Sequence, residues 1–234
     1  MKTSILSRMK RASIFFIALT ALTVFLTSCS KNDDDEVLTG QAKVMIVNSA
    51  SGSAAQDFYL EGTKVNTEAV AYSQSTAYIS VPVGYDRKAE FRNTGSTTAN
   101  FTGYVDILPN QNYTFFYTAS ADGTGNSSAV FRDETTSPSP SKARVRFVNA
   151  ASGLTTANLL IANGATIASN IAFGTASSFS DVDPGTLSLQ TGLAAGGTAA
   201  VNLGSFTLQP GKIYTIYTSG SLTSSVTASL ITHN

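Results

Sequence analysis

The chain contains the stretch Ala42-Lys-Val-Met-Ile-Val-Asn-Ser-Ala-Ser-Gly52 twice, since it returns as Ala143-Arg-Val-Arg-Phe-Val-Asn-Ala-Ala-Ser-Gly153. The two stretches begin at residues 42 and 143, an offset of 101 residues. The same offset aligns residues far downstream: Tyr78 with Phe179, Gly84 with Gly185, Pro109 with Pro210, and Tyr113-Thr114 with Tyr214-Thr215. A repeat of about 90 residues has the size of a small domain, not of a solenoid unit. The sequence therefore predicts two tandem domains, copy one over residues 42–134 and copy two over residues 143–234.

Within each copy, apolar and polar residues alternate, as where Val145 and Phe147 follow Arg144 and Arg146. This period of two is typical of half-buried strands. Turn signals such as Asp183-Pro184-Gly185 place Gly where a positive φ is needed. We therefore predict an all-β protein with two tandem antiparallel β-sandwich domains of immunoglobulin-like type, joined by a Ser/Pro linker over residues 135–142. Strands are expected near residues 42–48, 57–61, 76–81, 86–92, 99–107, 112–118 and 127–132, and 101 residues later in copy two.

The composition excludes several classes of protein. Of the 234 residues only 13% are charged, and 15 Lys and Arg balance 15 Asp and Glu, so charge provides no case for nucleic-acid binding. The single Cys excludes a disulfide framework and a Cys-based metal cluster. The single His, His233, excludes a site with several His ligands.

The first 28 residues are typical of an export signal. A basic start precedes the apolar run from Ala12 to Leu26, which is too short to span a membrane as a helix. The run ends in Leu26-Thr27-Ser28-Cys29, which resembles the lipobox of bacterial lipoproteins. The resemblance implies removal of residues 1–28 and lipidation of Cys29, so that the membrane becomes a partner through the N-terminal lipid.

Residues 29–41 are expected to form an acidic tether. Four acids stand together near its start: Asp33, Asp34, Asp35 and Glu36. A solvated spacer explains them, because like charges repel and extend a chain. They also resemble the signal that sends some lipoproteins to the outer face of the outer membrane. The expected location is therefore the outer membrane, with the protein exposed at the cell surface.

Several motifs in the two copies resemble one family. These are the strand ending Val-Asn-x-Ala-Ser-Gly, the Asp57-Phe-Tyr-Leu-Glu-Gly62 strand, the Val-x-x-Gly turn and the closing Pro-x-x-x-Tyr-Thr strand. Together they resemble the domain of unknown function 4397. The resemblance implies an exported or lipid-anchored bacterial β-domain, and it brings no catalytic residues.

The sequence offers little for catalysis or for metal binding. His233 is the penultimate residue, where chain ends usually fray, so we do not expect it to be catalytic. Carboxylates such as Asp57 and Glu61 are expected to be surface charges, because the aligned residues of copy two are Asn158 and Ala162, which are not acidic. Asp122-Gly-Thr-Gly-Asn126 resembles half a calcium loop but is expected to be a hairpin turn. We therefore predict no enzyme, no catalytic residue, no metal and no cofactor.

Most of the tyrosines lie in copy one. We expect Tyr72, Tyr78 and Tyr113 to belong to the core, because they align with Phe173, Phe179 and Tyr214. Tyr59, Tyr85 and Tyr104 remain as candidate ligand-binding residues, since exposed Tyr provides rigid contact area. The predicted function is adhesion or binding of a glycan or a surface protein, and the alternative is a structural spacer of the envelope with no ligand.

Overall fold

A computed structural model describes residues 38–193, 201–223 and 225–234. These residues form strands, turns and loops and no helices, so the all-β prediction is confirmed. In the described ranges, no helix is long and apolar enough to cross a membrane. The predicted signal peptide, Cys29 and the acids Asp33, Asp34, Asp35 and Glu36 lie outside the described residues.

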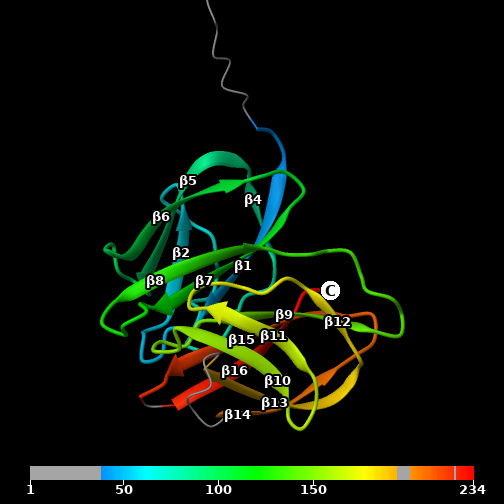
Figure 1. Ribbon diagram of the computed structural model, residues 1–234. Coiled ribbons are helices and arrows are strands. Elements are labelled where there is room, and N and C mark those ends of the chain that lie inside the picture. The colour runs from blue at the N-terminus through cyan, green and yellow to red at the C-terminus, as the bar shows by residue number, and fades with distance from the viewer. Residues whose placement is uncertain (1–37, 194–200, 224) are drawn as a thin grey trace, which may run out of the picture. The chain divides into compact units, whose positions relative to one another are not determined.

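Copy one folds into two sheets of four strands each. One sheet has the order β4-β1-β7-β8 and the other the order β3-β2-β5-β6 (Figure 1). The strands are β1 (Gln41–Asn48), β2 (Gln56–Leu60), β3 (Thr63–Lys64), β4 (Ile79–Pro82), β5 (Gly84–Asn93), β6 (Ala99–Ile107), β7 (Asn112–Ala119) and β8 (Asn126–Arg132). The two sheets enclose one apolar core, which includes Phe58, Phe91 and Phe115.

Copy two repeats this arrangement with sheets β12-β9-β15-β16 and β11-β10-β13-β14. Its strands are β9 (Ala143–Asn149), β10 (Thr156–Ile161), β11 (Thr166–Ala172), β12 (Ser180–Val182), β13 (Gly185–Leu193), β14 (Val201–Leu208), β15 (Ile213–Ser221) and β16 (Ser225–Thr232). Its core contains Phe147, Leu159 and Ile216. The two tandem sandwiches predicted from the repeat are thus confirmed.

Two features of the sheets differ from the alternation-based expectation. β1 pairs with β7 in parallel, and β9 pairs with β15 in the same way, whereas the other strand pairs are antiparallel. β3 and β11 were not expected, because Thr166–Ala172 lacks a clear period of two and Thr63–Lys64 is only two residues long. Gly185 behaves as predicted, since its φ is positive.

The two copies are in direct contact, because a third apolar cluster contains residues of both. Met45, Val47 and Phe116 of copy one pack there against apolar residues of copy two, namely Val148, Ala150, Tyr217 and Ile231. The rings of Phe116 and Tyr217 meet edge to face, with centroids 5.2 Å apart. β1 and β7 are consequently buried on both faces over most of their length, where alternation predicts one solvated face.

Candidate functional site

The three candidate tyrosines lie on the sheet β3-β2-β5-β6 of copy one. Tyr104 on β6 and Tyr85 at the start of β5 are the most exposed large side chains there, at 65% and 55%. Tyr59 on β2 is half-buried, because the Arg92 guanidinium lies 4.0 Å above the centre of its ring. Tyr113 is in the core as predicted. Tyr72 and Tyr78 are not, because they are half-buried and hydrogen-bond to copy two.

Charged side chains surround Tyr59 and Tyr104 on the sheet face turned away from the core. Lys64 pairs with Asp57 at 2.8 Å, and both Lys88 and Arg92 pair with Glu90 at 2.8 Å. Hydrogen bonds from Lys88 and Arg92 hold the pKa of Glu90 below its usual value. The expectation of simple surface charge is therefore wrong for Asp57, whose carboxylate is buried beneath its partner. The five charged side chains on this face are thus held in ion pairs with one another.

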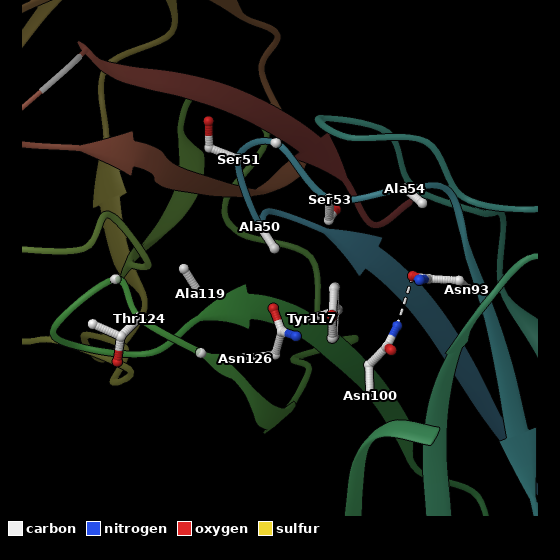
Figure 2. Close-up of a pocket in the computed structure, with 13 residues that line it drawn as sticks. Ala50, Ser51, Ser53, Ala54, Asn93, Asn100, Tyr117, Ala119, Thr124 and Asn126 are labelled. Atoms are coloured by element: carbon white, nitrogen blue, oxygen red, sulfur yellow. Dashed lines mark hydrogen bonds between the residues drawn. The ribbon is translucent and has the colours of Figure 1, made fainter. Parts of the chain in front are cut away.

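A pocket of about 360 Å³ opens at one end of copy one. Its walls come from the Ala-Ser-Gly loop after β1, the facing ends of β5 and β6, and the hairpin between β7 and β8 (Figure 2). Its lining is Ala50, Ser51, Gly52, Ser53, Ala54, Asn93, Asn100, Tyr117, Ala119, Gly123, Thr124, Gly125 and Asn126. Amides and hydroxyls line this pocket, and no lining residue carries a charge.

Three amide side chains organise one wall of the pocket. Gln56, fully buried, donates from Nε2 to Asn93 Oδ1 at 2.8 Å and accepts from Asn100 Nδ2 at 3.2 Å. Asn100 Nδ2 also donates to Asn93 Oδ1 at 2.6 Å, the bond dashed in Figure 2. This pattern uses the Asn93 oxygen and the Asn100 nitrogen. Within the described part of the chain, Asn93 Nδ2 and Asn100 Oδ1 have no protein partner, so the wall presents a donor beside an acceptor.

Tyr117 forms the floor of the pocket. Tyr117 is only 1% exposed and belongs to the lining of the pocket. Burial raises the pKa of the Tyr117 phenol, and the neighbouring Asn100 amide partly opposes that rise.

The two copies differ at this end because their hairpins differ. In copy two, β15 extends to Ser221. Ser152 of the Ala-Ser-Gly loop donates from its backbone N to Gly220 O and accepts at its O from Leu222 N, both at 3.0 Å. In copy one, β7 ends at Ala119, so the corresponding loop and hairpin separate around the pocket. The amides also differ, since the strand register places Ala157 and Leu193 of copy two where copy one has Gln56 and Asn93.

Copy two holds the hairpin of this pocket in place. Gly153 N donates to Ala121 O at 3.1 Å, which ties the hairpin to the Ala-Ser-Gly loop of copy two. Inside the hairpin, Asp122 accepts hydrogen bonds from Ser120 Oγ at 2.6 Å and from Thr124 N at 3.0 Å. These bonds lower the pKa of Asp122 to about 2. Asp122 thus acts as a turn former, and the described ranges contain no group of three or more metal-ligating side chains.

His233 is not frayed, so that expectation is wrong. Its side chain is 2% exposed and lies between the copies, in contact with Tyr78 of copy one and Thr215 of β15. Nearby, Asp133 and Arg146 form a buried ion pair at 2.6 Å, with side chains 0% and 3% exposed. The position of His233, sealed from solvent, serves packing between the copies and leaves no access for a substrate.

The fold and the pocket define a tandem β-sandwich protein with a polar pocket organised by amides in copy one. The family called domain of unknown function (DUF4397) matches residues 42–159 and 152–234, and the chain belongs to that family. The family resemblance seen in the sequence is therefore confirmed. No curated protein matches the chain.

Sequence reasoning missed the pocket residues. Asn93, Asn100 and Asn126 look like ordinary turn and strand-end residues, and the sequence gives no sign that they converge. One signal was present: Gln56 is a long polar residue where copy two has Ala157. Differences between aligned copies are where a function specific to one copy can lie.

Proposed function

We propose that this protein is a lipid-anchored, non-catalytic binding protein of the bacterial cell envelope, displayed on the outer membrane. The observation that supports binding is the pocket of copy one, where Asn93 Nδ2 can donate and Asn100 Oδ1 can accept a hydrogen bond. Such convergent polar groups in a concave site are typical of ligand recognition. A spacer without a ligand has no need for them.

Binding is tested with residues 30–234, purified without the lipid. We expect saturable binding to at least one member of a panel of immobilised glycans and extracellular-matrix proteins, because the pocket is already formed in the free protein. The control is the same panel with bovine serum albumin as the soluble protein. Absence of binding to every member would refute the binding function and favour the spacer.

The anchor is tested in cells by changing Cys29 to Ala. The wild type should incorporate labelled palmitate, and the variant should incorporate none and accumulate with its signal peptide uncleaved, because the thioether needs the Cys29 thiol. Labelling that persists in the variant would refute the lipoprotein assignment.

Surface display is tested with the lipidated protein in the same cells. Protease added outside should digest the wild type. A variant with Asp33, Asp34, Asp35 and Glu36 replaced by Asn and Ser keeps the tether length. It should remain lipidated but become protected if the acids direct export. Equal digestion of both proteins would mean that the acids are only a spacer, and equal protection would place the protein on the periplasmic side.

A further inference from the structure

We infer that the pocket of copy one binds an uncharged carbohydrate through its hydroxyl groups. This inference rests on the proposed binding function and specifies the ligand of the same site. It starts from the chemistry of the wall, where Asn93 Nδ2 can donate and Asn100 Oδ1 can accept. A sugar hydroxyl both donates and accepts, so one hydroxyl, or two adjacent ones, can satisfy both amide atoms.

The lining argues against a charged ligand. Among its residues none is ionisable except Tyr117, whose pKa burial raises, so this hydroxyl stays neutral. The nearby carboxylate of Asp122 is already occupied by hydrogen bonds inside the hairpin. An anionic or cationic ligand would lose hydration without gaining an opposite charge, which is costly.

The lining also argues against an apolar or aromatic ligand. The ring of Tyr117 is buried against Phe91, with centroids 5.1 Å apart, so no open aromatic face is offered for stacking. The rim adds Ser51, Thr124 and Asn126, whose side chains are short and polar. A site built from hydrogen-bonding groups rejects a ligand that leaves them unpaired. A neutral polyol is the ligand class that pairs them.

The amide wall is rigid before any ligand arrives. Gln56 also donates from Nε2 to Ala54 O at 2.8 Å, so it fixes the loop and both asparagines together. Copy two steadies the opposite wall through Gly153. Preorganisation of this kind reduces the entropy lost on binding. It also explains why a pocket in copy one needs copy two as its support.

The test uses residues 30–234 on an array of neutral oligosaccharides and their sulfated and carboxylated derivatives, with extracellular-matrix proteins as separate spots. The strongest neutral oligosaccharide is then titrated against three variants. Ala54→Trp fills the pocket while Gln56, Asn93 and Asn100 keep their amides, and Asn93→Ala removes the donor. Tyr104→Ser tests the tyrosine face as the competing site, and Ser205 occupies that register position in copy two. Thermal unfolding shows that each variant is folded.

We expect neutral oligosaccharides to bind, with affinity falling at least tenfold in Ala54→Trp and Asn93→Ala and unchanged in Tyr104→Ser. Binding to the anionic derivatives alone, or to the matrix proteins alone, would overturn the inference while the proposed function stands. Binding of neutral oligosaccharides that survives Ala54→Trp but is lost in Tyr104→Ser would place the site on the tyrosine face and would also overturn the inference. A chain that binds nothing on the array would refute both.

Discussion

Replacing Asp133 with Ala should lower the free energy of unfolding of residues 30–234 by about 3–5 kcal/mol. Asp133 Oδ1 accepts from Arg146 at 2.6 Å, and its Oδ2 accepts from Tyr78 and Thr114. Without the carboxylate, the guanidinium of Arg146 remains as a buried, uncompensated charge. Urea unfolding followed by circular dichroism at neutral pH measures the loss.

The matched control is Asp181→Ala, which breaks an ion pair at the surface. Asp181 Oδ1 lies 2.7 Å from Arg144 Nε, and hydrogen bonds from that guanidinium lower the pKa of Asp181. Exposed pairs contribute little to stability, because water and salt screen them. If Asp133→Ala lowers the free energy of unfolding no more than Asp181→Ala does, the buried ion pair does not stabilise the contact between the copies.

The fold was largely predictable because local signals agree with one another. The repeat gave the domain count, and the alternation around Phe147 and the Pro-Gly turns gave the strands. The contact between the copies was less visible. A signal for it exists in Val44-Met-Ile-Val47, four apolar residues without alternation, which is typical of a strand buried on both faces. Its counterpart in copy two, residues 145–148, contains Arg146, which concealed the pattern.

The pocket was not predictable, because its residues come from segments far apart in the chain. Asn93 and Asn126 line the same pocket only because β5 pairs with β6 and β7 pairs with β8. Alignment of the two copies left Tyr104 outside the expected core, and Tyr104 is exposed. Convergence of amides depends on register and on hairpin length, and neither is encoded in a short motif.

The buried network around Asp133 and Arg146 also predicts a dependence of stability on pH. Arg146 Nε donates to Thr215 Oγ1 at 3.1 Å, and Thr215 Oγ1 lies 2.7 Å from His233 Nε2. Tyr78 Oη lies 2.7 Å from His233 Nδ1 and donates to Asp133 Oδ2 at 2.8 Å. The Tyr78 proton is thus used, so Nδ1 carries the His233 proton and Nε2 accepts from Thr215. The hydrogen bonds close a ring that requires neutral His233.

Protonation of His233 should therefore destabilise the fold. Burial lowers the pKa of His233 from 6.5 to about 4, with Asp133 opposing this shift and Arg146 reinforcing it. The folded-state pKa lies below the unfolded one, so the unfolded state binds more protons between pH 6.5 and pH 4. The stability from neutral His233 is complete above pH 6.5 and declines as the pH falls. Since one pKa unit corresponds to 1.36 kcal/mol, the loss from pH 7.5 to pH 5 is about 2 kcal/mol.

The variant His233→Gln isolates this loss, because Gln does not titrate. We expect the wild type to lose about 2 kcal/mol more than the variant between pH 7.5 and pH 5 in urea unfolding, although the variant starts from a lower stability. Carboxylates such as Glu90 and Asp181, whose pKa values are lowered, titrate in both proteins and cancel in the difference. Parallel pH profiles for the two proteins would show that His233 has the same pKa in the folded and unfolded states and is therefore charged in the folded protein at pH 5. Such a result would contradict the ring of hydrogen bonds, because a charged His233 must donate from both nitrogens and leaves the Thr215 proton without its acceptor.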